Sequence, residues 1–139
     1  MKNIMIGVAA IALLLVGGSW WSRSTQAGKT GDVIALNGLH WHATLDVYVR
    51  GEKQEIPPSI GLIGAHMPIH THEDVPVIHL EFPGRVTAED TELGNFFENW
   101  GKEFMSFGSA VTMTVNGEPN TDLARYRMKD GDKIELRYE

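Results

Sequence analysis

The sequence of 139 residues contains no cysteine. Its absence excludes disulfide bonds, a metal site built on thiolates and a thiol nucleophile. The sequence also lacks a nucleophile elbow, a phosphate-binding loop, a His-Glu-x-x-His helix and a dinucleotide-binding fingerprint. A binding protein is therefore favoured over an enzyme, although a small metal-dependent enzyme stays open as an alternative.

Basic residues are scarce in most of the chain. After residue 27 there are ten lysines and arginines against all eighteen acidic residues, a net charge of −8. Proteins that bind nucleic acid present basic patches, so a nucleic-acid partner is not expected. An acidic domain is compatible with attracting cations.

Long apolar runs are also missing, with one exception at the N-terminus. Lys2 precedes an apolar stretch over residues 4–21, whose length is close to the lower limit of about 17 residues for a spanning helix. Residues 1–21 are predicted to be a membrane anchor or signal segment, with an uncleaved anchor favoured and a secreted product if it is cleaved. Residues 22–31 form a predicted linker, and residues 32–139 a His-rich domain outside the cytoplasm.

The remaining sequence predicts strands and one helix. Residues 39–49 and 77–82 alternate between apolar and polar side chains, which is typical of strands with one face on a core. Apolar residues at helical spacing predict an amphipathic helix that begins near Thr87 and ends at Gly101. With a closing strand at residues 134–138, these elements predict an α+β fold, a small mixed β-sheet with one packed helix.

Two turn signals near the C-terminus suggest a more specific fold. Val115-Asn116-Gly117, followed by the segment Lys129-Asp130-Gly131-Asp132 and an alternating strand, resembles the C-terminal half of β-grasp (ubiquitin-like) domains. The resemblance implies a β-grasp-like architecture, preceded here by the N-terminal transmembrane or signal helix. It implies no functional residues.

Five of the six histidines are the main chemical signal. A pair at positions i and i+2 of a strand projects both side chains from one face, and His40 and His42 satisfy this condition. His79 lies on the corresponding face of its strand. His70 and His72 are predicted to lie in the adjoining loop and to fold over that face. Imidazole is a common ligand of copper and zinc, so these five histidines predict a copper or zinc site.

Other polar residues near these histidines are given lesser roles. His66 is expected to be solvated. Glu81 and Asp74 are expected to orient an imidazole or be solvated, and Asp46 lies on the face of the His40 pair and could accept a hydrogen bond from it. An alternative without metal also stays open. Clustered histidines can form a pH-responsive polar surface, or a non-catalytic module for an unidentified protein partner.

Five short motifs form a further pattern in the sequence. His-Trp-His-Ala, Ile-Pro-Pro-x-Ile-Gly, Ile-His-Thr-His, Val-Ile-His-Leu-Glu and Leu-Gly-Asn-Phe-Phe-Glu-Asn-Trp-Gly fall within residues 38–138. Together they resemble a family of exported or membrane-anchored microbial His-rich domains of uncharacterised function. The resemblance implies that the histidines belong together, and no activity follows from it.

Overall fold

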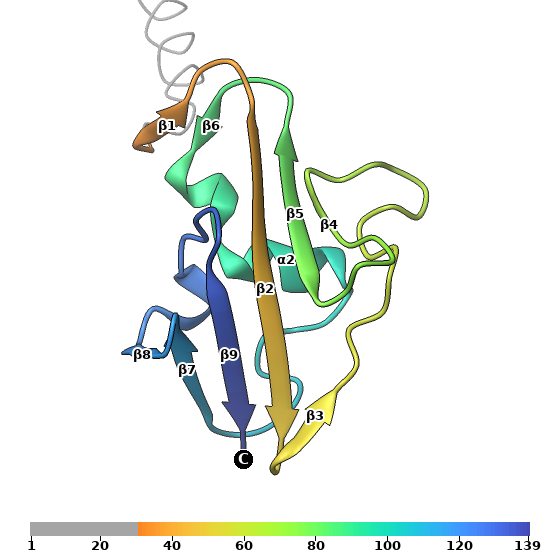
Figure 1. Ribbon diagram of the computed structural model, residues 1–139, viewed down its shortest axis with the longest axis vertical. Helices are drawn as coiled ribbons and strands as arrows, with labels where there is room; N and C mark the ends of the chain where they lie inside the picture. The colour runs from red at the N-terminus through yellow and green to blue at the C-terminus, as the bar shows by residue number, and fades with distance from the viewer. Residues whose placement is uncertain (1–30) are drawn as a thin grey trace, which may run out of the picture. The chain divides into compact units, whose positions relative to one another are not determined.

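Among residues 31–139, strand β2 is the longest element, and it runs through the middle of the main sheet (Figure 1). The computed structural model describes residues 31–139. The elements in chain order are β1 Val33–Ala35, β2 Leu39–Val49, β3 Glu52–Gln54, β4 Ile69–His70, β5 Val77–Phe82, β6 Val86–Thr87, the 3-10 helix η1 Ala88–Thr91, α2 Leu93–Asn99, β7 Val111–Val115, β8 Glu118–Asn120, the 3-10 helix η2 Leu123–Arg125 and β9 Lys133–Tyr138.

The main sheet has the strand order β4-β5-β2-β9-β7-β8, and β3 pairs with the far end of β2. Strands β5 and β2 are antiparallel, whereas β2 and β9 are parallel. Strands β1 and β6 form a separate two-stranded sheet. Four histidines lie on strands at one side of the main sheet: His40 and His42 on β2, His70 on β4 and His79 on β5. A fifth, His72, follows β4 directly.

The core lies between one face of the sheet and α2. Ala43, Leu45 and Val47 of β2 are buried, as their alternation predicts, and so are Ile78 and Leu80 of β5. From the helix, the buried residues are Leu93, Phe96 and Phe97. Burial on one face leaves the intervening residues of β2 and β5 on the face away from α2, and the histidines occupy these positions.

The predicted α+β, β-grasp-like fold class is wrong. Strands make up 39% of the described residues and helical turns only 13%, with a single α-helix. The sequence signal at Thr87 belongs to a short 3-10 helix, because Asp90 accepts hydrogen bonds from both the backbone N–H and the hydroxyl of Thr87. The chain is then extended at Glu92, so α2 begins only at Leu93 and has seven residues.

The predicted membrane helix at residues 1–21, and the linker up to residue 30, lie outside the described residues. Between residues 31 and 139, the structure contains no helix that is both long and apolar enough to cross a membrane. The part of the chain that the structure describes, Gly31–Glu139, is one compact unit.

Candidate metal site

A row of three histidines crosses three neighbouring strands. His42 of β2 is paired with His79 of β5, and His79 is paired with His70 of β4. Directly paired residues on adjacent strands project from the same face and lie about 5 Å apart. The rings of His42 and His79 are 4.7 Å apart, and those of His70 and His79 are stacked at 5.6 Å. Strands β2 and β5 are therefore neighbours, and His42 and His79 lie on one face of the sheet.

A second row lies two residues along the same strands. His40 is paired with Glu81, and its Nε2 lies 3.3 Å from the Glu81 carboxylate. The same carboxylate oxygen lies 3.9 Å from Nδ1 of His79. Glu81 therefore stands between the exposed His40 and the largely buried His79, whose side chains are 63% and 11% exposed.

His70 lies in a strand rather than in the predicted loop. The preceding loop folds back along β4, because Met67 donates its N–H to Gly61 and Thr71 donates its N–H to Ile60. The Thr71 hydroxyl also donates to the carbonyl of Pro57. This covering leaves His70 fully buried. The loop therefore shields the His70 imidazole, which is 0% exposed, from solvent.

The hydrogen bond of His70 fixes which ring nitrogen is available. Its Nδ1 lies 2.9 Å from the carbonyl oxygen of Met67, and a carbonyl only accepts, so Nδ1–H is the donor. Burial lowers the pKa of His70, which favours the neutral ring. In the neutral ring with the proton on Nδ1, the lone pair is on Nε2. His70 can therefore bind a metal through Nε2.

His79 is fixed in the opposite tautomer. Its Nε2 lies 3.1 Å from both carboxylate oxygens of Asp74, so Nε2–H donates to Asp74. This hydrogen bond lowers the pKa of Asp74. Nδ1 of His79 is buried and has no hydrogen-bond partner among residues 31–139. Unpaired buried polar atoms are rare because each costs free energy, so this nitrogen is where a further ligand would be expected.

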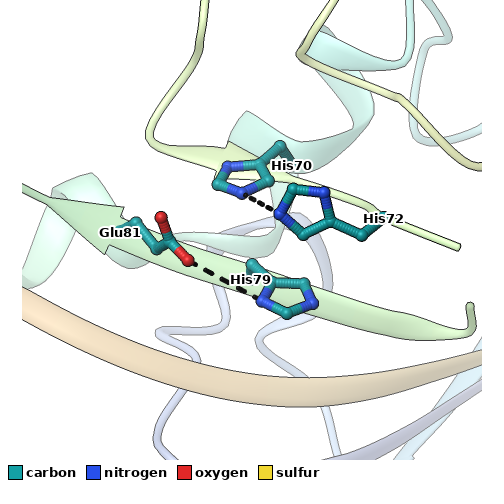
Figure 2. A group of neighbouring side chains, drawn as sticks. All are labelled: His70, His72, His79 and Glu81. Carbon is teal, nitrogen blue, oxygen red and sulfur yellow. Dashed lines mark hydrogen bonds and ion pairs between the residues drawn. The ribbon is translucent and has the colours of Figure 1, made fainter. Parts of the chain in front are cut away.

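Four side chains converge on one space (Figure 2). His70 of β4, His72 of the following loop, and His79 and Glu81 of β5 each offer a ligand atom within 4.8 Å of the others. We call these four residues the inner group. A second set, His40, His42 and His79, meets the same condition and is called the outer group. Either group can hold a metal ion, and both groups include His79.

The closest contact in the inner group has the dimensions of a metal site. Nε2 of His70 and Nε2 of His72 lie 3.2 Å apart. Two nitrogens bound to one metal at about 2.0–2.1 Å lie about 3.4 Å apart in tetrahedral geometry and about 2.9 Å apart in square geometry. Without metal, His72 Nε2–H donates to the lone pair of His70. Exchanging this proton for a metal ion requires little movement.

The structure brings all five predicted site residues, His40, His42, His70, His72 and His79, into the two groups, which overlap at His79. The sequence indicated Asp74 and Glu81 as orienting or solvated residues. Asp74 orients His79, while Glu81 also offers a ligand atom. The signal for Glu81 was its place two residues after His79 on one strand face.

Two other expectations near the site have different outcomes. Asp46 forms an ion pair with Lys53, with 2.7 Å between the Asp46 carboxylate and Nζ of Lys53. His66 is exposed, as expected for a solvated residue, but its ring lies 4.7 Å from that of His70. His66, His40 and Glu81 line an open cleft of about 760 Å³ beside the two groups.

The arrangement combines three or more imidazoles, one carboxylate and an open cleft on one sheet face. Such a donor set suits a divalent transition metal. One ring nitrogen of His70 and one of His79 are already held in hydrogen bonds, to Met67 and Asp74 respectively.

Comparisons of the chain with family models, curated proteins and solved structures give no match.

Proposed function

We propose that the domain binds one divalent transition metal ion, zinc or copper(II), at the inner group. Nε2 of His70, Nε2 of His72 and Nδ1 of His79 would supply three nitrogen ligands, and Glu81 would supply an oxygen. Four such ligands complete a tetrahedral zinc site or a tetragonal copper(II) site.

One observation carries the proposal. His70 and His79 each use one ring nitrogen in a hydrogen bond to a fixed acceptor, which leaves the other nitrogen with a lone pair. That other nitrogen lies 3.2 Å from Nε2 of His72 in the case of His70, and 3.9 Å from the Glu81 carboxylate in the case of His79. Outer-sphere acceptors of this kind fix the tautomer and orientation of metal-binding histidines. A solvated or merely polar cluster gives no reason for Nδ1 of His79 to be buried without a hydrogen bond.

The donor types favour zinc and copper(II) over copper(I). Copper(I) prefers thiolate and thioether sulfur, and the chain has no cysteine. Met67, the methionine nearest to the site in sequence, contacts His70 through its carbonyl oxygen. Imidazole with one carboxylate suits the harder divalent ions.

We further propose that the domain works outside the cytoplasm, held by the apolar segment at residues 4–21. Metal binding for delivery or sensing at the cell surface fits an acidic domain whose metal groups lie on an open sheet face. The motif resemblance to exported or membrane-anchored His-rich domains supports this location.

The test is metal content in the full chain, purified without a histidine tag. The wild type should retain about one equivalent of zinc or copper after dialysis, and His70→Ala with His72→Ala should lose it, because only the outer group then remains. His66→Ala is the matched control, because it removes a neighbouring histidine that belongs to neither group. Absence of metal, with no thermal shift on adding either ion, would overturn the proposal. It would favour the alternative in which the clustered histidines form a pH-responsive polar surface without metal. A full equivalent of metal retained after dialysis in the double variant would place the site elsewhere.

A further inference from the structure

The inner and outer groups compete for one residue. His79 is a member of both, and its Nε2 is held by Asp74, so only Nδ1 is available as a ligand. A nitrogen lone pair binds one metal ion at a time. The two groups therefore cannot both be filled with His79 as a ligand in each.

The two groups differ in access to solvent. Both histidines that belong to the outer group alone, His40 and His42, are exposed. The inner group has one exposed histidine, His72, and one that is fully buried beneath the loop that precedes β4, His70. An ion bound at His70 would therefore lie deeper than one held by His40, whose side chain lines the open cleft.

Glu81 connects the two groups. One of its carboxylate oxygens lies 3.3 Å from Nε2 of His40 and 3.9 Å from Nδ1 of His79. When a cation binds the imidazoles of the outer group, the carboxylate beside them is attracted to it. Glu81 can thus become a ligand of the same ion without a change in the backbone.

We propose that the two groups act in series on one metal ion. His40 and His42 capture the ion together with His79, and the ion then moves to His70, His72 and Glu81 while His79 remains bound. Exchange of one ligand at a time keeps the ion coordinated throughout, so no step requires a bare ion. This inference rests on the proposed metal-binding function and adds a route into the site.

The experiment is rapid mixing of the metal-free full chain with copper(II) chloride, followed by the visible absorption band and by electron paramagnetic resonance of frozen samples. The wild type should show a fast phase whose rate depends on copper concentration and a slower phase that does not. The slower phase should change the spectrum as the protein ligands change from His40, His42 and His79 to His70, His72, His79 and Glu81. One copper ion per chain is expected at the end.

Variants separate the two steps. His40→Ala with His42→Ala should remove the fast phase and slow uptake by about tenfold or more, while reaching the final wild-type spectrum. His70→Ala with His72→Ala should keep the fast phase and stop at the spectrum of the intermediate. The matched control is Thr44→Ala, which lies on β2 two residues after His42 and belongs to neither group; it should keep both phases.

Three outcomes would overturn the inference. These are uptake at the wild-type rate in His40→Ala with His42→Ala, a single phase in the wild type, or two copper ions per chain. If the wild type binds no copper or zinc at all, the proposed function itself fails. If it binds one ion but the outer pair does not affect the rate, only the serial route fails.

Discussion

The inner and outer groups are built from the same side chain in different surroundings. In the inner group, His70 donates to a backbone carbonyl and is fully buried, and the loop over residues 59–67 fixes its position. In the outer group, the His40 side chain is 63% exposed and its Nε2 lies 3.3 Å from the Glu81 carboxylate. His79 takes part in both and is held by Asp74.

This difference bears on affinity. A site whose ligands are already oriented loses little conformational entropy when the metal binds, whereas exposed side chains must be ordered at that moment. The inner group should therefore bind the metal more tightly, and the outer group should exchange it faster. Changes that remove the shared residue, its orienting partner or the covering loop should affect the two groups to different extents.

Replacing the shared histidine should have the largest effect. His79→Gln retains the size of the side chain but removes the Nδ1 ligand from both groups at once. We expect metal affinity to fall more than about a hundredfold, beyond the loss usual for an outer-sphere residue. Competition with a chelator of known affinity measures this loss. A variant that still binds as tightly as His40→Ala with His42→Ala would show that His79 is not shared.

Removing the partner that orients His79 should have a smaller effect. Asp74→Ala leaves every ligand in place but frees the tautomer and orientation of the ring, so metal affinity should fall about 10- to 100-fold. Glu73→Ala is the matched control, because Glu73 is the adjacent exposed acid and belongs to neither group. The same chelator competition applies. Equal losses in the two variants would indicate general attraction by negative charge rather than orientation of His79.

Much of the outer group could be predicted from the sequence. Alternation in β2 and β5 places His40, His42 and His79 on one face, because their neighbours in sequence are needed by the core. The pairing of β2 with β5 does not follow from this alternation, because β3 and β4 lie between the two strands in the chain. Periodicity over six residues or more is a strong local signal.

The inner group could not be predicted in the same detail. Strand β4 has only two residues, too few for any alternation, and its pairing with β5 depends on the loop that folds over it. The tautomer of His70 depends on the carbonyl of Met67, which any residue type could supply at that position. The helical content was overestimated for a related reason, since the capping signal at Thr87 does not show that the chain becomes extended at Glu92.

The covering loop offers the most selective way to separate the two groups. Gly61 has a φ of +74°, and a Cβ there would lie 2.6 Å from the carbonyl oxygen of Ile69 and 3.2 Å from Cβ of His70. Gly61→Ala should therefore push the loop away from β4 and expose His70. The outer group lies on β2 and β5 and does not depend on these contacts.

We expect Gly61→Ala to weaken equilibrium metal affinity by about tenfold, within the lower range for a lost supporting contact, without slowing the first phase of copper uptake. Gly64→Ala is a close control, because Gly64 lies in the same loop with a φ of +84° but a Cβ there meets nothing within 4 Å. Both variants incur the cost of an alanine in the left-handed region, about 1–2 kcal/mol of stability. Only Gly61→Ala adds the collision with β4, so chelator competition should separate the two variants even where their thermal unfolding is similar. Equal affinities in the two variants would mean that the loop covers His70 without holding it in place, and that burial alone does not distinguish the inner group from the outer one.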